Sequence, residues 1–332
     1  MATAIHNITY GKLEPADFAQ AHALWNAGAQ NEYPHRKLSP AQFSELFLTS
    51  TDHIAKVNVA AKDGDILVGF ANGCVVPGKG IGYITFVLVD PAYRREGIGS
   101  GLLWRLEEVL GTIEPLESYQ ISFFNPINLT WMIPGSKEHD HPNAPGIEVT
   151  SGAYIFFKNR GYIDTAYQNS FYLPLADFQI ASKIQERIDT LPEKGLSICL
   201  YDREKHFGLD ELFTDLGNEL WREEIMGNVN RPDGGEPVLI AEHKGQAVGF
   251  TGPLHVQESG RGYFAGIGVH SEFRKFGLGK ALFSMLCKTL KDMGAGYMTL
   301  FTGETNPARN IYQSAGFKIV KSWTDMEKKV QK

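Results

Sequence analysis

One short motif occurs twice in this chain, with the same spacing of basic residues and glycines in each copy. The first copy is Arg94-Arg95-Glu96-Gly97-Ile98-Gly99, and the second, Arg274-Lys275-Phe276-Gly277-Leu278-Gly279, begins 180 residues later. Each copy follows an apolar run typical of a strand and precedes leucines at helical spacing. A glycine turn between a strand and a helix gathers unpaired amide N–H groups at the positive end of the helix dipole. The repeat therefore predicts two sites suited to a pyrophosphate.

The repeat extends beyond this motif. Val68-Gly69-Phe70 returns as Val248-Gly249-Phe250 at the same offset. The chain therefore reads as two copies of one α/β domain with a mixed sheet, each long enough to bury a core. We expect a first domain at 1–175, a linker with a connecting helix at 176–195 and a second domain at 196–332.

Local patterns predict several elements of these domains. Ser39 before Pro40 is typical of a helix N-cap followed by the first helical residue. The apolar stripe over Leu209–Met226 predicts a single helix, and Lys244-Gly245 predicts the turn of a hairpin. In the first copy only, the segment Asn125–Ser151 is rich in Pro, Gly, Asn and His, and we expect an irregular excursion there.

Composition excludes some functions. A net charge of −6 and a pI of about 5.9 disfavour non-specific binding to nucleic acid, which needs a broad basic surface. Three widely spaced cysteines without a C-x-x-C pair disfavour a disulfide framework and favour a reducing compartment. The stretch Met1–Pro15 lacks a leader pattern, and no run of apolar residues is long enough to span a membrane. We expect a cytoplasmic protein that binds neither nucleic acid nor membrane.

The glycine spacing discriminates between nucleotide-binding motifs. The third glycine of a dinucleotide fingerprint is replaced by Leu102 in one copy and Leu282 in the other, and the kinase-type loop G-x-x-x-x-G-K-[ST] is absent. The remaining pattern, R-x-x-G-x-G on a strand-to-helix turn, resembles the acetyl-CoA-binding motif of the GNAT acyltransferase superfamily. Near the end of the chain, Asn306–Phe317 is similar to that family's last-helix pattern, with its alanine shifted by one position.

This resemblance implies two tandem GNAT domains, in a layout similar to that of mycothiol-synthase-like proteins. It implies an N-acetyltransferase that uses acetyl-CoA as co-substrate and transfers the acyl group directly to a primary amine. We expect a small-molecule amine as acceptor, no metal, and a monomer or homodimer. Two alternatives stay open: an acyl-CoA sensor without turnover, and a peptide or protein N-acetyltransferase.

The resemblance also assigns residues that bind the cofactor. In the family the thioester lies along the strand before the glycine loop, and that strand splays from its neighbour. The cofactor-binding residues expected in the second half are Ile267, Gly268, Val269, Arg274, Lys275, Phe276, Gly277, Leu278, Gly279, Lys280 and Asn306. Those expected in the first half are Val87, Val89, Arg94, Arg95, Gly97 and Gly99.

The catalytic residues are expected in the second half. Tyr312 stands where the family places a tyrosine that protonates the departing thiolate, and a phenol suits that role. Glu304 is the best-placed candidate for the general base, with Glu223 and Glu224 as other candidates. Each of these carboxylates has an ordinary surface role as its alternative.

The first half departs from the family at the same point. Aligning Gly161 with Gly316 puts Phe157 opposite Tyr312, and phenylalanine has no proton to give. Ser151 stands opposite Asn306. The first domain is therefore expected to be degenerate or structural and the second to be catalytic, unless another donor such as Tyr154 acts in the first.

The excursion at Asn125–Ser151 contains His139 and His141, which invite a metal hypothesis. Pro and Gly nearby make a regular strand doubtful, and no third ligand is evident, so a metal site is disfavoured. A loop that covers the acceptor pocket is the preferred interpretation.

Overall fold

The computed structural model describes residues 7–28, 33–136 and 138–331, so the start of the stretch Met1–Pro15 lies outside the described residues. Its contacts divide the chain into two units. Unit 1 holds Met1–Gln168 and Lys321–Lys332, and unit 2 holds Asn169–Val320. The two units are described one after the other.

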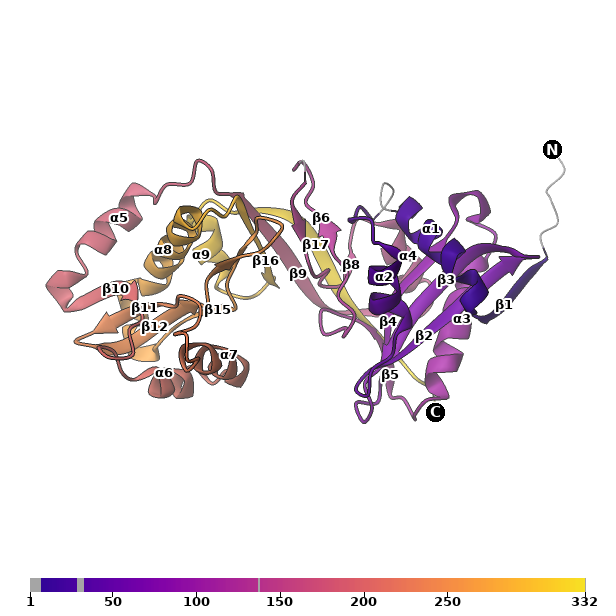
Figure 1. The fold of residues 1–332 in the computed structure, drawn as a ribbon, viewed down its shortest axis with the longest axis horizontal. Helices are drawn as coiled ribbons and strands as arrows, with labels where there is room; N and C mark the ends of the chain where they lie inside the picture. Colours follow the sequence, from indigo (N-terminus) through magenta and orange to yellow (C-terminus); the bar gives the residue numbers. More distant parts are fainter. Residues whose placement is uncertain (1–6, 29–32, 137, 332) are drawn as a thin grey trace. The chain divides into compact units, whose positions relative to one another are not determined.

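The sheet of unit 1 is antiparallel over its first strands and has one parallel pair. Its strands in chain order are β1 (Ile8–Lys12), β2 (Ala55–Asp63), β3 (Ile66–Val75), β4 (Ile81–Val89) and β5 (Ser118–Ile121) (Figure 1). Alternating side chains of β3 supply two cores, since Val68 and Ala71 face one layer while Leu67 and Phe70 face the other. A strand that is buried on both faces needs a layer of helices on each of them.

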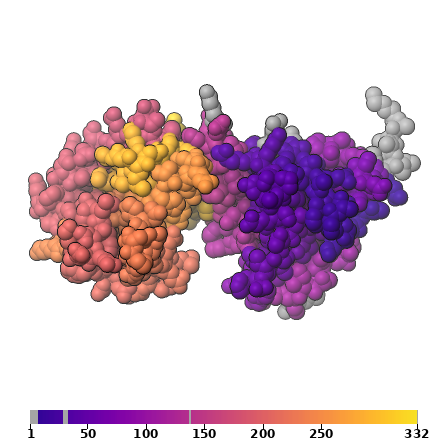
Figure 2. All heavy atoms as spheres, in the orientation of Figure 1, coloured from indigo at the N-terminus to yellow at the C-terminus, as the bar shows by residue number. Residues whose placement is uncertain are grey.

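Helices cover both faces of this sheet. Helix α3 (Ile98–Gly111) packs on β2, β3 and β4 through Leu102, Leu106 and Leu110. On the other face lie α1 (Phe18–Gly28), α2 (Pro40–Phe43) and a π-helical turn (Ser44–Leu48), whose indigo atoms cover much of the face shown in Figure 2. The Ser39 hydroxyl accepts a hydrogen bond from the Gln42 amide, which confirms the predicted N-cap.

The excursion after β5 is irregular, as expected, and carries only short strands. They are β6 (Trp131–Met132), β7 (Asp140–His141) and β8 (Ile147–Glu148), and helix α4 (Gly152–Lys158) follows. Strand β8 pairs with residues near the end of the chain, Glu148 opposite Trp323. The excursion therefore folds back onto unit 1.

Unit 2 repeats this plan. Its antiparallel sheet contains β10 (Leu196–Leu200), β11 (Leu239–His243), β12 (Gln246–Gly252) and β15 (Gly266–Val269). The predicted hairpin turn is confirmed, because Lys244 and Gly245 join β11 to β12 with φ of 53° and 86°. Further strands are β13 (His255–Val256), β14 (Gly262–Tyr263) and β16 (Tyr297–Gly303).

The helices of unit 2 differ from the sequence prediction in two places. The predicted helix Leu209–Met226 is two helices, α6 (Leu209–Leu216) and α7 (Glu219–Val229), because Gly217 takes a φ of 62° and Asn218 caps the second. The predicted linker helix is α5 (Ser182–Asp189), and it packs against α8 (Leu278–Asp292). Leu175 and Leu191, which flank it, belong to the core of unit 2. The last helix is α9 (Arg309–Ser314). The chain also has 3₁₀ turns at Pro15–Asp17, Pro91–Tyr93, Pro192–Lys194 and Ser271–Phe276.

Each unit contains strand residues from the other half of the sequence. The boundaries at Gln168 and Val320 fall inside β9 (Ile163–Pro174) and β17 (Lys318–Lys329), whereas the sequence suggested ranges of 1–175 and 196–332. In unit 1, β17 pairs with β5, Met326 opposite Ile121. In unit 2, β9 pairs with β16, and the Thr299 hydroxyl donates to the Phe171 carbonyl at 2.9 Å. The end of the chain is therefore part of the core of unit 1.

Trp323 gives a test of this exchange. Its side chain is 1% exposed and lies 5.2 Å from the ring of Trp131, so Trp323→Ala should destabilise unit 1 by about 3–5 kcal/mol. Hydrogen exchange should show lost protection in α3 and unchanged protection in α8. Trp104→Ala, at a tryptophan 65% exposed on α3, is the control and should have little effect. Loss of protection confined to α8 would contradict the division.

Candidate functional site

The parallel pair β4 and β5 opens partway along its length. Residues 81–83 of β4 pair with 118–120 of β5, but β4 continues to Val89 while β5 ends at Ile121. The pairing of β4 with β3 also shifts by one residue beside Thr85, between the pairs Phe86–Asn72 and Ile84–Gly73. Such a bulge re-aims a side chain and ends regular pairing. One edge of β4 is therefore left without a strand partner from Ile84 onward. At its start, the Asn125 amide donates to the Ile84 carbonyl at 3.1 Å.

The first glycine loop follows this strand directly. Gly97 takes a φ of 85° as the N-cap of α3, a conformation that favours glycine, and nothing lies within 4 Å of where its Cβ would stand. The amides of Ser100 and Gly101 donate to the Gly97 carbonyl, whereas the amides of Ile98 and Gly99, which begin the first turn, have no helical acceptor. The Arg94 Nε donates to the Val89 carbonyl at 3.1 Å, so this arginine ties the loop to β4.

Arg160 completes this loop, and the sequence analysis missed it. Its guanidinium donates to the Ser100 hydroxyl and, at 2.7 Å, to the Phe156 carbonyl. It also lies 3.7 Å above the Phe156 ring, whose edge would be 3.1 Å from a Cβ on Gly99. Burial lowers the pKa of Arg160. The sequence did offer a signal: Arg160 follows α4 in the first copy, and the second copy has Ala315 at the corresponding position.

A cleft of about 790 Å³ runs from this loop along the open edge of β4. Val87, Val89, Arg94, Arg95, Gly97 and Gly99, the residues expected to bind cofactor in the first half, all line it. Its other walls come from α1, the excursion, α4 and β17, including Trp25, Tyr33, His35, Ser122, Glu148 and Trp323. The excursion therefore forms a wall of the cleft.

Several polar groups of this cleft are buried without hydrogen-bond partners. Among the described residues these include the indole Nε1 of Trp25, the hydroxyl of Thr85 and the hydroxyl of Ser122. Because buried polar groups are nearly always paired, such a cluster on a cleft wall is available to ordered water or to a ligand.

His35 presents a neutral imidazole to the same cleft. Its Nδ1 lies 2.8 Å from the Tyr33 carbonyl, so Nδ1 carries the proton and Nε2 keeps its lone pair. Burial lowers the pKa of His35, although the carbonyls of Tyr33 and Trp25 oppose this effect. Nε2 is buried without a partner of ordinary hydrogen-bond geometry. A neutral imidazole of this kind can accept a proton from a substrate.

The acidic group of the cleft is already paired. Glu148 lies in an ion pair with Lys321 and accepts a hydrogen bond from the Thr150 hydroxyl at 2.9 Å.

The residues of unit 1 that were compared with the family's tyrosine and asparagine have structural roles. Phe157 is buried in the core of unit 1. Tyr154 donates to Asp164 at 3.0 Å, and it does not appear among the lining residues. Ser151 caps α4 by accepting from the Tyr154 amide.

The second glycine loop shares the left-handed glycine with the first but differs in the residues before it and in its surroundings. Arg95 has a φ of 70° in the first loop, whereas Ser271–Phe276 forms a continuous 3₁₀ turn in the second. Gly277 takes a φ of 72° and caps α8, and the Arg274 Nε donates to the Val269 carbonyl at 3.2 Å, as in the first copy. However, a Cβ on Gly277 would overlap the guanidinium of Arg187, which comes from α5. Gly279 has surroundings as close as those of Gly99, because a Cβ on Gly279 would stand 3.1 Å from Ile311.

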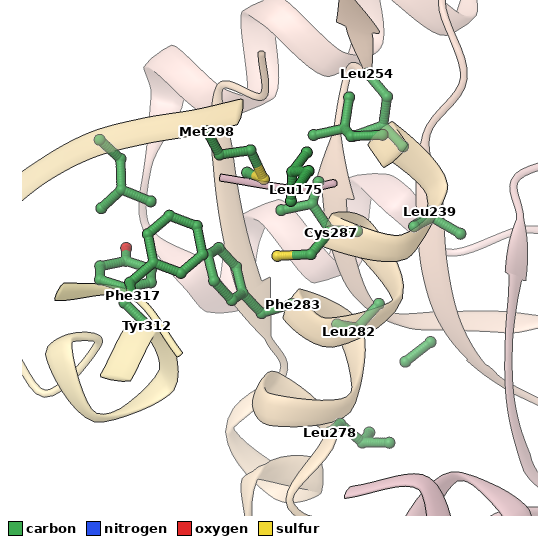
Figure 3. Packing of buried hydrophobic residues seen from close by; sticks show 14 of the residues in the cluster. Leu175, Leu239, Leu254, Leu278, Leu282, Phe283, Cys287, Met298, Tyr312 and Phe317 are labelled. Atoms are coloured by element: carbon green, nitrogen blue, oxygen red, sulfur yellow. The ribbon is translucent and has the colours of Figure 1, made fainter. Parts of the chain in front are cut away.

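Tyr312 lies in the core of unit 2. Its side chain is 7% exposed and packs against Phe283, 4.9 Å between ring centroids, and beside Phe317 (Figure 3). Burial raises the pKa of Tyr312 to about 12. The Tyr312 phenol therefore packs among apolar side chains of the core of unit 2.

The other residues expected in the second half lie in mixed positions. Ile267, Gly268 and Val269 form β15, and a Cβ on Gly268 would stand 2.5 Å from Leu216, which gives that glycine a packing reason. The Asn306 side chain accepts from the Ala308 amide at 2.9 Å. The structure places the remaining candidates as follows: Lys275, Lys280, Glu223, Glu224 and Glu304 are exposed, Phe276 is half-buried, and Leu278 is buried.

An open hollow of about 550 Å³ lies in unit 2 away from this loop. Its lining comes from α7 and the β12 to β14 region and includes Glu224, Arg231, His255 and Tyr263, with no residue of the glycine loop.

Among the described residues, no group of three or more His, Cys, Asp and Glu side chains is arranged to hold a metal ion. His141 is buried, with its Nδ1 2.8 Å from the Asn143 carbonyl.

The fold and the site define a class: α/β acyltransferases in which a parallel strand pair opens beside a glycine loop. The chain belongs to the acetyltransferase (GNAT) family. The sequence model of that family matches residues 19–113 and 200–317, which together are more than half of the chain. This confirms the predicted family and the two tandem domains.

Solved structures of tandem proteins share the fold. A tandem GNAT protein from the clavulanic acid biosynthesis pathway is 15% identical, with a TM-score of 0.60 and coverage of 98% of this chain and 99% of that one. A GNAT acetyltransferase from Sphaerobacter thermophilus is 15% identical, with a TM-score of 0.62 and coverage of 99% and 98%.

A third structure is a GNAT glucosamine N-acetyltransferase region within a fungal multi-domain β-N-acetylglucosaminidase. It is 17% identical, with a TM-score of 0.67, and covers 98% of this chain, which spans only 38% of that longer protein. At these identities the structures show the fold alone. No curated protein sequence matches the chain significantly. Every helix in the described ranges is too short or too polar to span a bilayer.

A buried carboxyl behind the cleft wall makes the stability of unit 1 depend on pH. Burial raises the pKa of Asp325 on β17 to about 6, and its Oδ1 faces Gly146, which lines the cleft. Because this pKa exceeds that of an unfolded chain, the folded state holds the proton more tightly. The stabilisation is present below about pH 4 and is lost as the pH rises through about 6.

The corresponding test is Asp325→Asn. Raising the pH from about 4 to about 7 should lower the unfolding free energy of the wild type by about 1–3 kcal/mol relative to that of the variant. Urea unfolding followed at several pH values measures it. Asp52→Asn, at an exposed carboxyl of the same unit, is the control. A pH-independent difference for Asp325→Asn would refute the assignment.

Proposed function

We propose that this protein is an acetyl-CoA-dependent N-acetyltransferase acting on a small primary amine, with its active site in the cleft of unit 1. The observation that carries the proposal is that one cleft joins an open glycine loop to buried, unpaired polar groups. Acetyl-CoA supplies an activated acetyl thioester. The residues present fit it, since the space at Gly97 is open and cationic groups stand beside it.

Each part of the cleft has a role in this proposal. The first-turn amides of α3 and the Arg160 guanidinium bind the phosphates, because both supply donors to anions. The unpaired edge of β4 offers backbone groups to the pantetheine amides, as in strand addition. The walls from α1 and the excursion hold the acceptor amine.

The reaction requires a neutral amine as nucleophile and the departure of the CoA sulfur as the leaving group. The amine nitrogen attacks the thioester carbonyl carbon, the C–N bond forms, and the C–S bond breaks. The amine proton goes to Nε2 of His35, and the sulfur leaves as a thiolate that takes a proton from solvent. His35 therefore replaces Glu304 as the proposed base.

The proposal reverses the sequence-based assignment of catalysis to the second half. Tyr312 is part of a packed core, and the Arg187 side chain lies over Gly277. In unit 1 the corresponding glycine, Gly97, faces open space. These contacts support the first half as the active one and unit 2 as the structural one.

A matched pair of glycine variants tests this division. Gly99→Val and Gly279→Val each place a branched side chain at a position where one neighbour lies 3.1 Å from the new Cβ. Their packing costs are therefore similar. Gly99→Val should abolish acetyl-CoA binding and thiol release with an amine panel, whereas Gly279→Val should spare most turnover. Calorimetry with CoA and a thiol assay measure both. The reverse result, in folded proteins, would return catalysis to the second half.

His35→Gln tests the proton acceptor. Because the amide cannot take the proton, kcat at neutral pH should fall by about 10²-fold with acetyl-CoA affinity unchanged. In the wild type, activity should rise with pH below 6.5, since burial lowers the His35 pKa from that value. The variant should lose this limb and regain activity only as the amine itself deprotonates. His22→Gln is the control, because the His22 imidazole also contacts a backbone carbonyl but does not line the cleft.

One observation favours a second function. Phe157 occupies the position of the family's tyrosine in unit 1, which suits a protein that binds acyl-CoA without turnover. Acetyl-CoA binding with no thiol release for any amine would support this alternative over catalysis. The amine panel should include glucosamine, because the fungal structure with the same fold is named a glucosamine N-acetyltransferase.

A further inference from the structure

The unpaired polar atoms of unit 1 are concentrated at its cleft. Of the eight such buried side-chain atoms among the described residues, five belong to residues that line this cleft. Arg160 lies at the loop. The other four are Trp25, His35, Thr85 and Ser122, each of them 6–8% exposed. They come from α1, the α1–α2 connection, β4 and the end of β5, so the fold brings them to one cavity from four separate segments.

These four atoms form a mixed set. Trp25 Nε1 is a donor only, His35 Nε2 is an acceptor, and the two hydroxyls can do either. Leaving each unpaired costs about 1–3 kcal/mol, so an apolar amine bound here would leave that cost in place. A ligand with several hydroxyl groups removes it.

Aromatic rings accompany these atoms. Trp25 lies 4.8 Å from Phe86 and 4.3 Å from His35, measured between ring centroids. Half-buried Tyr33 and Phe86 also line the cleft. Rings of this kind pack against the C–H face of a saturated ring, while polar groups at the edge bind its hydroxyls.

The charges of the cleft disfavour a polyamine. Glu148 is the one carboxylate among the described lining residues, and it is paired with Lys321. The other charged lining residues are arginines: Arg94, Arg95 and Arg160. A dication would find no free anionic partner here.

We propose that the acceptor is a primary amine on a hydroxylated saturated ring, an amino sugar or aminocyclitol, whose hydroxyls bind Trp25, Thr85 and Ser122 and whose amine faces His35. This inference rests on the proposed function. It adds the chemical class of the acceptor and the residues that select it.

The test compares glucosamine with cyclohexylamine, a ring amine without hydroxyls, in wild type and variants. Thr85→Val and Ser122→Ala each remove a hydroxyl with little change in shape. Each should lower kcat/KM for glucosamine roughly tenfold more than for cyclohexylamine. Comparing variant with wild type for each amine cancels the difference in their basicity. Thr299→Val, which removes a buried hydroxyl from unit 2, should affect neither ratio.

Binding gives a readout independent of turnover. Calorimetry of glucosamine against the protein saturated with CoA should detect binding that Thr85→Val weakens, and no binding of cyclohexylamine. Glucosamine binding without thiol release would refute the proposed function and leave only the binding of the hydroxylated ring by these residues standing. Acetylation of cyclohexylamine or lysine with no binding of glucosamine would overturn the inference alone, as would equal losses for both amines in the variants.

Discussion

The open edge of β4 is the constraint on which the site of unit 1 depends. A buried backbone group needs a partner, and β4 has lost its partner on one side from Ile84 onward because β5 ends early. Asn125 satisfies the first carbonyl, and the rest of the edge faces the cleft. The bulge at Thr85 and the loop at Gly97 follow on the same strand and its turn. A ligand with amides and phosphates matches this order of unpaired groups. On the proposed function, one local break in pairing therefore defines where the ligand binds and through which groups.

The second determinant is the exchange of terminal strands. Trp323 and Lys321 come from the last strand of the chain, yet they line or support the cleft of a unit formed mostly by the first half of the sequence. Phe171 makes the reverse contribution, since it packs against Tyr312 in unit 2. Neither half of the sequence therefore encodes a complete core. Each unit therefore needs a strand from the other half of the sequence, even though the two repeats share one plan.

The sequence predicted what depends on neighbouring residues. The glycine loops, the Ser39 cap, the hairpin turn at Lys244-Gly245 and the family all follow from local spacing, and the structure or the family match confirms them. Other features depend on residues far apart in the chain. Trp25, His35 and Ser122 meet only because the sheet order places their elements around β4. The strand exchange leaves no local pattern at all, and Gly217 broke a helix whose apolar stripe was continuous.

The two glycine loops show why a conserved local pattern does not decide function. Both have a left-handed glycine as the helix N-cap and an arginine that bonds the last carbonyl of the strand. They differ in the second cation. In unit 1 it is Arg160, which bonds Ser100 at the side of the loop and leaves the space at Gly97 open. In unit 2 it is Arg187, which arrives from α5 and lies over Gly277. The half that kept the family's tyrosine thus has its loop covered, and the half with the open loop has lost the tyrosine. On the proposed function, catalysis in unit 1 consequently relies on binding and on deprotonation of the amine by His35, because the leaving thiolate needs no phenol when solvent can protonate it.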